Sequence, residues 1–428
     1  MSGGVAVAPA SRLSEWWRRM RNPAIWQPTA DTFAVLTALT LPWSTSLVGI
    51  FSACWFGSVA LIIDYPAYLR SLKRPISALP LALFALAAIG TLWSDASWNA
   101  RFYAIGPAIK LLFLPVLFYY FERSTRGMWV FVAFLVSCTV LMAVSWLVLL
   151  EPSITLKRDD PQRGIFVKNY IDQGQEFALC AVALAYPIWA LVRERKPWKA
   201  LGLLGISLGL LVNMVFVIVS RTAIVTMPIM LAVFAALHLR RRTSVMIFAA
   251  VVLLAGASWA ASPQLRATID SFFRDYQLYK EKNIPTSIGL RLEFWGKSLQ
   301  FIQEAPLAGH GTGSTRKLFE RVAVGDPALR ASGNVIGNPH NQTLNVAVQW
   351  GVLGIAVLWA MWISHLLLFR GEGLVAWIGL LVVVQNVFTS LFNSHLFDFH
   401  EGWMYVLGVG VAGGMVLGAR SKNQPKDP

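Results

Sequence analysis

The sequence predicts an all-α, polytopic membrane protein, and three observations lead to this fold class. Of the 428 residues, 56% are hydrophobic and only 14% are charged, whereas soluble domains average about 25% charged residues. Apolar blocks recur along the chain, and at about 17–25 residues each is long enough to cross a hydrocarbon core as a helix. The 18 Trp residues fit this class, because indole side chains favour the membrane–water interface.

The apolar blocks predict about twelve transmembrane helices, at 31–44, 46–63, 77–93, 102–121, 128–150, 174–192, 200–218, 221–238, 243–261, 343–367, 373–392 and 402–418. They divide the chain into an N-terminal tail (1–30), nine helices (31–261), a large loop (262–342), three helices (343–418) and a C-terminal tail (419–428). The N-terminal tail has no apolar core of a cleaved signal peptide. Its aromatic and basic stretch at 14–21 predicts contact with an anionic membrane surface.

The positive charge of the chain predicts its orientation. The net charge is +15. If the N-terminus is cytoplasmic, more than half of the 37 basic residues fall in the tails and the short cytoplasmic loops, and the rest of the chain is nearly neutral. This bias is the positive-inside pattern. We therefore expect both termini in the cytoplasm and the large loop outside, with membrane lipids and no nucleic acid as partners.

The loop at 262–342 is too long to be a simple connector, and loops of this length are usually functional. An amphipathic helix is predicted at 288–304, with Thr286 or Ser287 as its cap and Pro306 after its end. Its apolar stripe is expected to consist of Leu292, Trp295, Leu299 and Ile302. A second, short helix is expected to begin at Ser314.

Two arginines are candidates for binding an anion. Arg221 lies at the external end of the eighth predicted helix, where it is either an anchor that reaches the interface or an anion ligand. Arg291 lies on the amphipathic helix, where it either pairs with Glu293 or Glu304 or remains free for a ligand.

The motif Asn338-Pro339-His340-Asn341-Gln342 directly precedes a predicted helix. Asn favours the cap of a helix and Pro favours its first turn, so we expect His340 in the first turn. The helix dipole there opposes a positive charge and favours the neutral imidazole, which is the form of a general base. The alternative is an interfacial histidine bonded to a loop carbonyl.

Other features have weaker chemical interpretations. The segment Gly309-His310-Gly311-Thr312-Gly313 is expected to be a turn, since neither a preceding strand nor a Lys completes a nucleotide motif. The last external loop contains four possible metal ligands, His395, Asp398, His400 and Glu401. Their spacing matches no compact metal motif.

Lys110 lies within a predicted transmembrane helix, where a charge marks either a ligand pathway or an internal pair. The three Cys are expected to be free thiols within apolar blocks.

Five segments in this order resemble the bacterial O-antigen ligase and polymerase superfamily, and its ligase branch in particular. They are Ser220-Arg221-Thr222, the segments 291–295 and 309–313, Pro339-His340-Asn341-Gln342-Thr343-Leu344, and Gln349-Trp350-Gly351-Val352-Leu353-Gly354.

This resemblance implies a membrane-embedded, GT-C-like glycosyltransferase of the bacterial inner membrane, with its active site on the periplasmic side. The implied reaction is inverting and independent of metals and cofactors. The donor is an O-antigen glycan on undecaprenyl diphosphate, and the acceptor is a hydroxyl of lipid A–core. The family places a histidine and two arginines at the reaction centre, which match His340, Arg221 and Arg291. Asn341 and Lys110 are further candidate substrate contacts.

The residue chemistry agrees with this implication. A glycosyl diphosphate leaves when cations stabilise its growing charge, and the large loop contains no Asp-x-Asp metal pair. Two arginines able to make bidentate phosphate contacts are the natural substitute for a metal.

Three alternative functions remain: an O-antigen polymerase with the same donor, a ligase that glycosylates protein, and a flippase or exporter of lipid-linked sugars. A transporter of this size is often built from repeated halves, and we find no internal repeat.

Overall fold

The computed structural model describes residues 21–159, 162–282, 284, 286–323 and 336–423. Over these residues the chain is helical and contains no strand, which confirms the predicted all-α class. Apart from Arg21, the predicted membrane-surface stretch at 14–21 lies outside the described residues.

The helices follow one another along the whole chain. They are α2 (Pro23–Thr40), α3 (Thr45–Ile62), α4 (Tyr65–Ser71), α5 (Pro75–Ile89), α6 (Trp98–Ile109), η1 (Lys110–Leu112), α7 (Phe113–Phe121), α8 (Gly127–Leu150), η2 (Pro152–Ile154), α9 (Tyr170–Ala183), α10 (Ala185–Arg193), α11 (Pro197–Phe216), α12 (Arg221–His238), α13 (Arg241–Ala261), α14 (Pro263–Lys282), α15 (Ser287–Glu304), α16 (Ser314–Ala323), α18 (Gln342–Leu368), α19 (Leu374–Thr389) and α20 (Phe399–Asn423).

Within the described part of the chain, nine helices are long and apolar enough to cross a membrane. The count rises to ten if α4 and α5, which meet at a bend of 85°, are taken as one broken span. Each of the twelve predicted segments overlaps a helix, but α19 is a shorter apolar helix of 16 residues, and α2 is not among the candidate spans. The chain is therefore a multi-pass membrane protein.

The predicted continuous helix at 102–121 is wrong in one respect, because it is interrupted by the 3₁₀ turn η1. Pro107 lies inside α6, where its ring and its missing N–H weaken the helical hydrogen-bond ladder. The Lys110 ammonium in η1 donates to the carbonyl oxygens of Phe397 (3.1 Å) and Asp398. These hydrogen bonds connect the interrupted span to the loop that precedes α20.

The apolar stripe predicted for α15 is also wrong, because Leu292 and Leu299 are 40% and 54% exposed. The helix instead buries Phe294 and Phe301, and the rings of both lie edge-on to Phe319 of α16, at centroid distances of 5.7 and 5.3 Å. Both helices begin where the sequence indicates, at the Thr286 cap and at Ser314. This small core turns α15 towards α16, so that Leu292 and Leu299 of the predicted stripe lie outside it while Ile302 packs against it.

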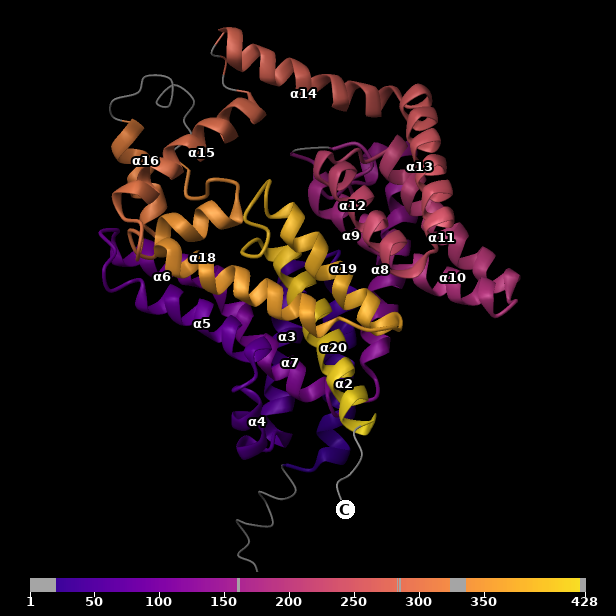
Figure 1. Ribbon diagram of the computed structural model, residues 1–428, viewed down its shortest axis with the longest axis horizontal. Coiled ribbons are helices and arrows are strands. Elements are labelled where there is room, and N and C mark those ends of the chain that lie inside the picture. The colour runs from indigo at the N-terminus through magenta and orange to yellow at the C-terminus, as the bar shows by residue number, and fades with distance from the viewer. Residues whose placement is uncertain (1–20, 160–161, 283, 285, 324–335, 424–428) are drawn as a thin grey trace, which may run out of the picture.

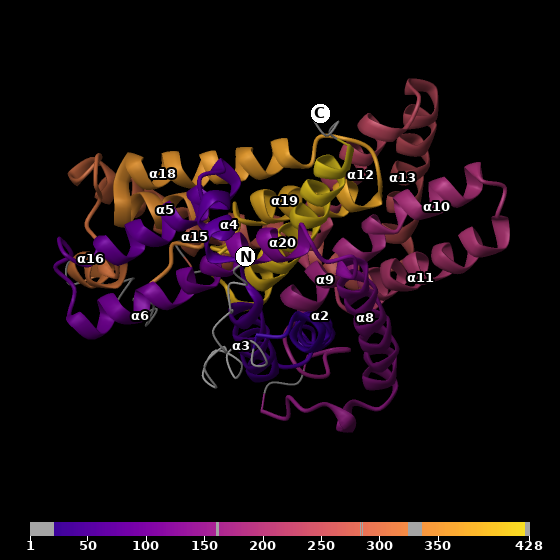
Figure 2. The same ribbon diagram turned by 90° about the horizontal axis from the view of Figure 1, so that it is seen from below.

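Figures 1 and 2 show two groups of helices on either side of α20. One group contains α8 to α13, and the other contains α5, α6, α15, α16 and α18. Helix α14 runs from α13 across to α15 (Figure 1), and it contacts α11 as well as both of these neighbours. Helix α14 was not predicted from the sequence, since its mixed charges form no apolar block. This helix links the two groups on the side of the large loop.

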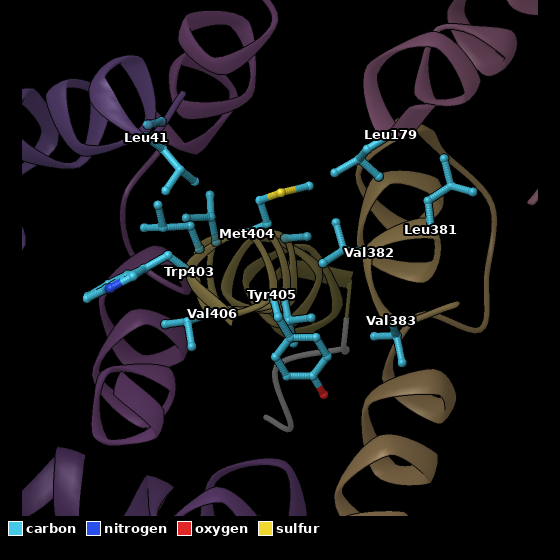
Figure 3. Close-up of a cluster of buried hydrophobic side chains, with 14 of the residues drawn as sticks. Leu41, Leu179, Leu381, Val382, Val383, Trp403, Met404, Tyr405 and Val406 are labelled. Carbon is cyan, nitrogen blue, oxygen red and sulfur yellow. The ribbon is translucent and has the colours of Figure 1, made fainter. Parts of the chain in front are cut away.

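Helix α20 is enclosed by its neighbours. The four consecutive residues Trp403, Met404, Tyr405 and Val406 are all buried, and Figure 3 shows their side chains pointing in different directions around the helix axis. Successive residues of a helix are about 100° apart, so four buried in a row mean contact on every side. The helix therefore forms the centre of the bundle.

The glycine-rich segment 309–313 is a tightly docked turn, which confirms the turn and excludes a free phosphate-binding loop. The Gly311 N–H donates to Gln349 O (2.8 Å), and the Thr312 N–H donates to Gly90 O (2.9 Å). Gly311 has a φ of +84°, and a Cβ there would lie 2.6 Å from the backbone of Ser94. The turn thus fixes the large loop to α5 and α18 and needs glycine for this close approach.

Glycines of α20 permit its close approach to α7, and we predict that Gly414→Ala destabilises the protein. A Cβ at Gly414 would lie 2.6 Å from Phe121 Cβ and 2.9 Å from Phe118 O, and overpacking of this kind costs about 1–3 kcal/mol. The melting temperature of the purified protein should fall. Gly57→Ala in α3 is the matched control, because a Cβ there meets no atom within 4 Å. An equal or higher melting temperature for Gly414→Ala would contradict this packing.

Candidate functional site

The turn that leads into α18 carries His340. Asn341 is the N-cap of α18, and its Oδ1 accepts a hydrogen bond from the Leu344 N–H at 3.0 Å. The predicted position of His340 in the first turn is therefore wrong, because His340 lies one residue before the cap. Its φ is +54°, a left-handed conformation that is uncommon for residues other than glycine and that surrounding contacts must hold.

Hydrogen bonds from two neighbouring segments hold this left-handed turn. The His340 N–H donates to Asn338 Oδ1 at 2.9 Å, and the same oxygen accepts from Ser394 Oγ at 2.7 Å. The Asn338 Nδ2 group donates to Asn393 Oδ1 at 3.1 Å. The loop between α19 and α20, which contains Asn393 and Ser394, is thus bonded directly to the turn before α18.

The imidazole of His340 has a defined tautomer. Its Nδ1 lies 2.9 Å from Asn393 Oδ1, and Asn393 Nδ2 lies 2.7 Å from Asp398 Oδ2. A carboxylate can only accept, so the amide nitrogen of Asn393 faces Asp398 and its oxygen faces the ring. Nδ1 therefore carries the proton, and Nε2 keeps an unprotonated lone pair. The partner is a side-chain amide and not the loop carbonyl of the alternative interpretation.

The surroundings of His340 favour the neutral ring. Burial lowers the pKa of His340 below its ordinary value, the hydrogen bond to Asn393 opposes this shift, and the positive charge of Arg291 reinforces it. Phe294 of α15 lies nearly parallel to the ring, with centroids 6.2 Å apart and planes at 29°. The site therefore holds a neutral imidazole at neutral pH.

Arg291 on α15 is half-buried, and among the described residues it has no hydrogen-bond or ion-pair partner. The predicted alternative of a pair with Glu293 or Glu304 is wrong. Glu293 pairs with Lys297 at 2.9 Å and Glu304 pairs with Arg321 at 2.6 Å. Burial lowers the pKa of Arg291, yet a guanidinium remains charged at any physiological pH. A partly desolvated cation without a counter-ion favours binding of an anion.

Arg221 is the first residue of α12, and its guanidinium is held by α14. It donates to Asp275 Oδ2 at 3.2 Å and to Ser271 Oγ at 2.5 Å, and it lies over the Phe272 ring, 4.8 Å from the centroid. The charge of Arg221 lowers the pKa of Arg291, and the charge of Arg291 lowers that of His340. The structure thus brings all three predicted residues into one electrostatic neighbourhood.

Asn341 and Lys110 are both engaged in contacts within the protein. Asn341 caps α18 and donates from Nδ2 to Leu391 O at 3.2 Å. Lys110 is only 6% exposed, and its ammonium donates to carbonyl oxygens of the loop before α20. Both residues support the loop that contains Asn393.

The acidic and histidine residues predicted as a weak metal candidate form a compact group. The ligand atoms of His395, Asp398 and Glu401 all lie within 4.8 Å of one another. His400 instead pairs with Asp172 at 2.7 Å. Burial alone would lower the pKa of His395, but the facing carboxylates of Glu401 and Asp398 outweigh it and raise the pKa. The raised pKa of His395 favours an ion-pair network with these carboxylates and opposes metal binding, because a metal takes the neutral imidazole.

Sequence reasoning missed Asn393 and the orienting role of Asp398. The two residues lie more than fifty positions after His340, and Asn393 belongs to no motif of known spacing. The available signal was the density of polar residues at 393–401 between two apolar helices. Such a cluster is costly at a membrane surface unless its members bond to one another or to a ligand.

We predict that the purified protein holds no stoichiometric divalent cation at His395, Asp398 and Glu401. The Asp398 carboxylate is engaged by Asn393, and His395 favours a proton. After dialysis against a chelator and then against zinc or magnesium, elemental analysis should find no bound metal, and His395→Ala should not change the result. One equivalent of metal that is lost in His395→Ala would contradict this interpretation.

Comparison with known proteins connects this geometry to a family. Residues 206–359 match the family described as O-antigen ligase. The matched segment runs from α11 into α18 and contains all three residues of the electrostatic neighbourhood. No curated protein matches the chain. The match therefore places a segment similar to the O-antigen ligase family across the part of the chain that contains these three residues.

Proposed function

We propose that this protein is an O-antigen ligase, which transfers an O-antigen glycan from undecaprenyl diphosphate to a sugar hydroxyl of lipid A–core. One observation carries the proposal: a neutral histidine with a fixed tautomer lies within the electrostatic influence of an arginine that has no partner among the described residues. An inverting transfer from a glycosyl diphosphate needs a base for the acceptor and a cation for the leaving group. His340 and Arg291 supply this pair.

In this reaction the acceptor oxygen attacks the anomeric carbon of the first donor sugar. As the new C–O bond forms, the acceptor proton passes to His340 Nε2. The bond between the anomeric carbon and the phosphate oxygen breaks, and undecaprenyl diphosphate leaves with the electron pair. Because attack comes from the face opposite the leaving group, the anomeric configuration inverts.

The leaving diphosphate gains negative charge, which Arg291 is placed to stabilise. Arg221 is bound to Asp275 and Ser271, so it would exchange these contacts for phosphate oxygens when the donor binds. A guanidinium offers five N–H donors in a planar fork, which allows bidentate phosphate contacts. Arg291 is therefore the preformed phosphate site, and Arg221 joins it only when the donor binds.

The proposal places the large loop, with α14 to α16, on the periplasmic side of the bacterial inner membrane and both termini in the cytoplasm. The distribution of basic residues supports this orientation. The two substrates are amphipathic lipids, and a site at the end of the bundle can be reached by both while their lipid parts stay in the membrane.

We predict that variants of His340 and of Arg291 fail in different ways. His340→Ala should reduce turnover about 10²–10⁴-fold, as expected for loss of a general base, with donor affinity nearly unchanged. Arg291→Ala should reduce turnover about 10²–10³-fold and weaken donor binding, and Arg291→Lys should rescue only partly. Donor affinity and transfer rate are measured on the same purified variants, without added metal.

Arg274→Ala is the matched control, since this arginine of the same loop is exposed on α14. It should keep normal turnover. Near-normal turnover of His340→Ala, or loss of donor binding as complete as in the arginine variants, would show that His340 is not the base.

We also predict how the activity depends on pH. The base must be unprotonated, and the pKa of His340 is lowered, so activity should persist to a pH below about 6.5, the ordinary histidine value. It should then fall as the pH drops through the lowered pKa. In the double variant Asn393→Asp/Asp398→Asn, a carboxylate accepts from Nδ1 directly and the net charge is unchanged. An adjacent opposite charge shifts a pKa by about 1–3 units, so the acid limb should move to higher pH.

The single variant Asp398→Asn is the control, because it removes the charge without placing a carboxylate at the ring. Burial raises the pKa of Asp398 to about 6, so this control also shows how much of the acid limb comes from Asp398. An acid limb that is identical in the wild type and the double variant would contradict the role of His340 as the titrating base.

A further inference from the structure

A cavity of about 820 Å³ with polar and apolar lining lies between α6, α16 and the start of α18. Its volume falls in the range of about 300–1,000 Å³ that is usual for small-molecule sites. Beside apolar residues such as Pro107 and Phe397, the cavity is lined by amide, carboxylate, hydroxyl and basic side chains and by Tyr103. The lining therefore suits a ligand that is rich in hydroxyl groups.

Three polar side chains of the cavity have no hydrogen-bond partner within the described part of the chain. Asp95 and Asn99 are exposed at the start of α6. Thr315 of α16 is only 2% exposed, and its Oγ1 is buried without a partner. A buried, unpaired hydroxyl is costly, and a hydroxyl of a bound sugar would satisfy it.

The aromatic side chain of Tyr103 adds a second feature of saccharide sites. Tyr103 is 84% exposed and lines the cavity. A flat, exposed ring can pack against the C–H face of a sugar, while its hydroxyl remains a hydrogen-bond donor and acceptor.

The cavity is joined to the support of the proposed base. Asn338 lines it and also accepts the hydrogen bond of the His340 backbone N–H. Asp398 lines it and orients Asn393, which holds the ring.

The cavity thus adjoins the groups that hold His340, the proposed base. In an inverting transfer the base contacts the acceptor hydroxyl, whereas the leaving diphosphate lies on the opposite face of the anomeric carbon. From this arrangement we propose that the cavity binds the terminal saccharide of the acceptor, with Asp95, Asn99, Thr315 and Tyr103 as its contacts. The inference rests on the proposed ligase function and names the acceptor site within it.

The neighbouring aromatic residues Tyr103 and Phe102 provide a matched test. Both are exposed on α6, at 84% and 63%, but Phe102 does not line the cavity. Tyr103→Ala should raise the KM for the acceptor on the order of 10-fold, as expected when an aromatic contact of about 1.4 kcal/mol is lost. The donor KM and the turnover at saturating acceptor should stay within about 2-fold of wild type, and Phe102→Ala should change none of these values.

A binding measurement separates this inference from the function on which it rests. Delipidated core oligosaccharide should show saturation-transfer NMR signals with the wild-type protein and with Phe102→Ala, and lose them with Tyr103→Ala. Binding of this pattern without any glycan transfer would refute the ligase function and support the saccharide site. Normal transfer with an unchanged acceptor KM in Tyr103→Ala, or equal effects of the two variants, would overturn the site and leave the function standing.

Discussion

The hydrogen bond between His340 Nδ1 and Asn393 Oδ1 is the contact on which the proposed site depends. It joins the turn before α18 to the loop before α20, two segments more than fifty residues apart in the sequence. Asp398 accepts a hydrogen bond from the Asn393 amide and orients it, and Asn338 in the turn before α18 donates to the same amide. The Lys110 ammonium donates to a backbone carbonyl oxygen of the loop before α20 and so fixes that loop. The left-handed conformation of His340 is held by these contacts, and the same contacts select the tautomer. A strained residue held by several neighbours is typical of functional sites.

The other helices position charged side chains around this hydrogen bond. The enclosed helix α20 and its neighbours form the bundle centre, and the turn at 309–313 fixes α15 and α16 to it. Helix α14 crosses from one group of helices to the other and holds Arg221 through Asp275. Because α14 contacts both α13 and α15, a shift of this helix would change the position of Arg221 relative to Arg291. In the proposed mechanism, recruitment of Arg221 by a donor would therefore be coupled to the helix that links the two groups of helices.

The membrane class, the helix order and the caps at Thr286 and Ser314 could be predicted because they depend on local composition and spacing. Arg221, Arg291 and His340 could be named because they belong to motifs in a recognisable order. The sequence did not indicate Asn393 as a partner, since that contact depends on how α18 and α20 pack. The predicted position of His340 was wrong because Asn338 and Asn341 are both acceptable caps, and only hydrogen bonds to other segments decide between them. The buried face of α15 was missed for the same reason: Phe319 of another helix selects Phe294 and Phe301 over the leucine stripe.

The most direct test of the ligase account is the lipopolysaccharide of a host strain that lacks this gene. Long-chain lipopolysaccharide should disappear, and lipid-linked O-antigen of full chain length should accumulate. The wild-type gene should restore the long chains, and a gene encoding His340→Ala should not. Accumulation of lipid-linked glycan of a single repeat unit would instead identify a polymerase. Unchanged long-chain lipopolysaccharide in the deletion strain would contradict a role of this protein in O-antigen transfer.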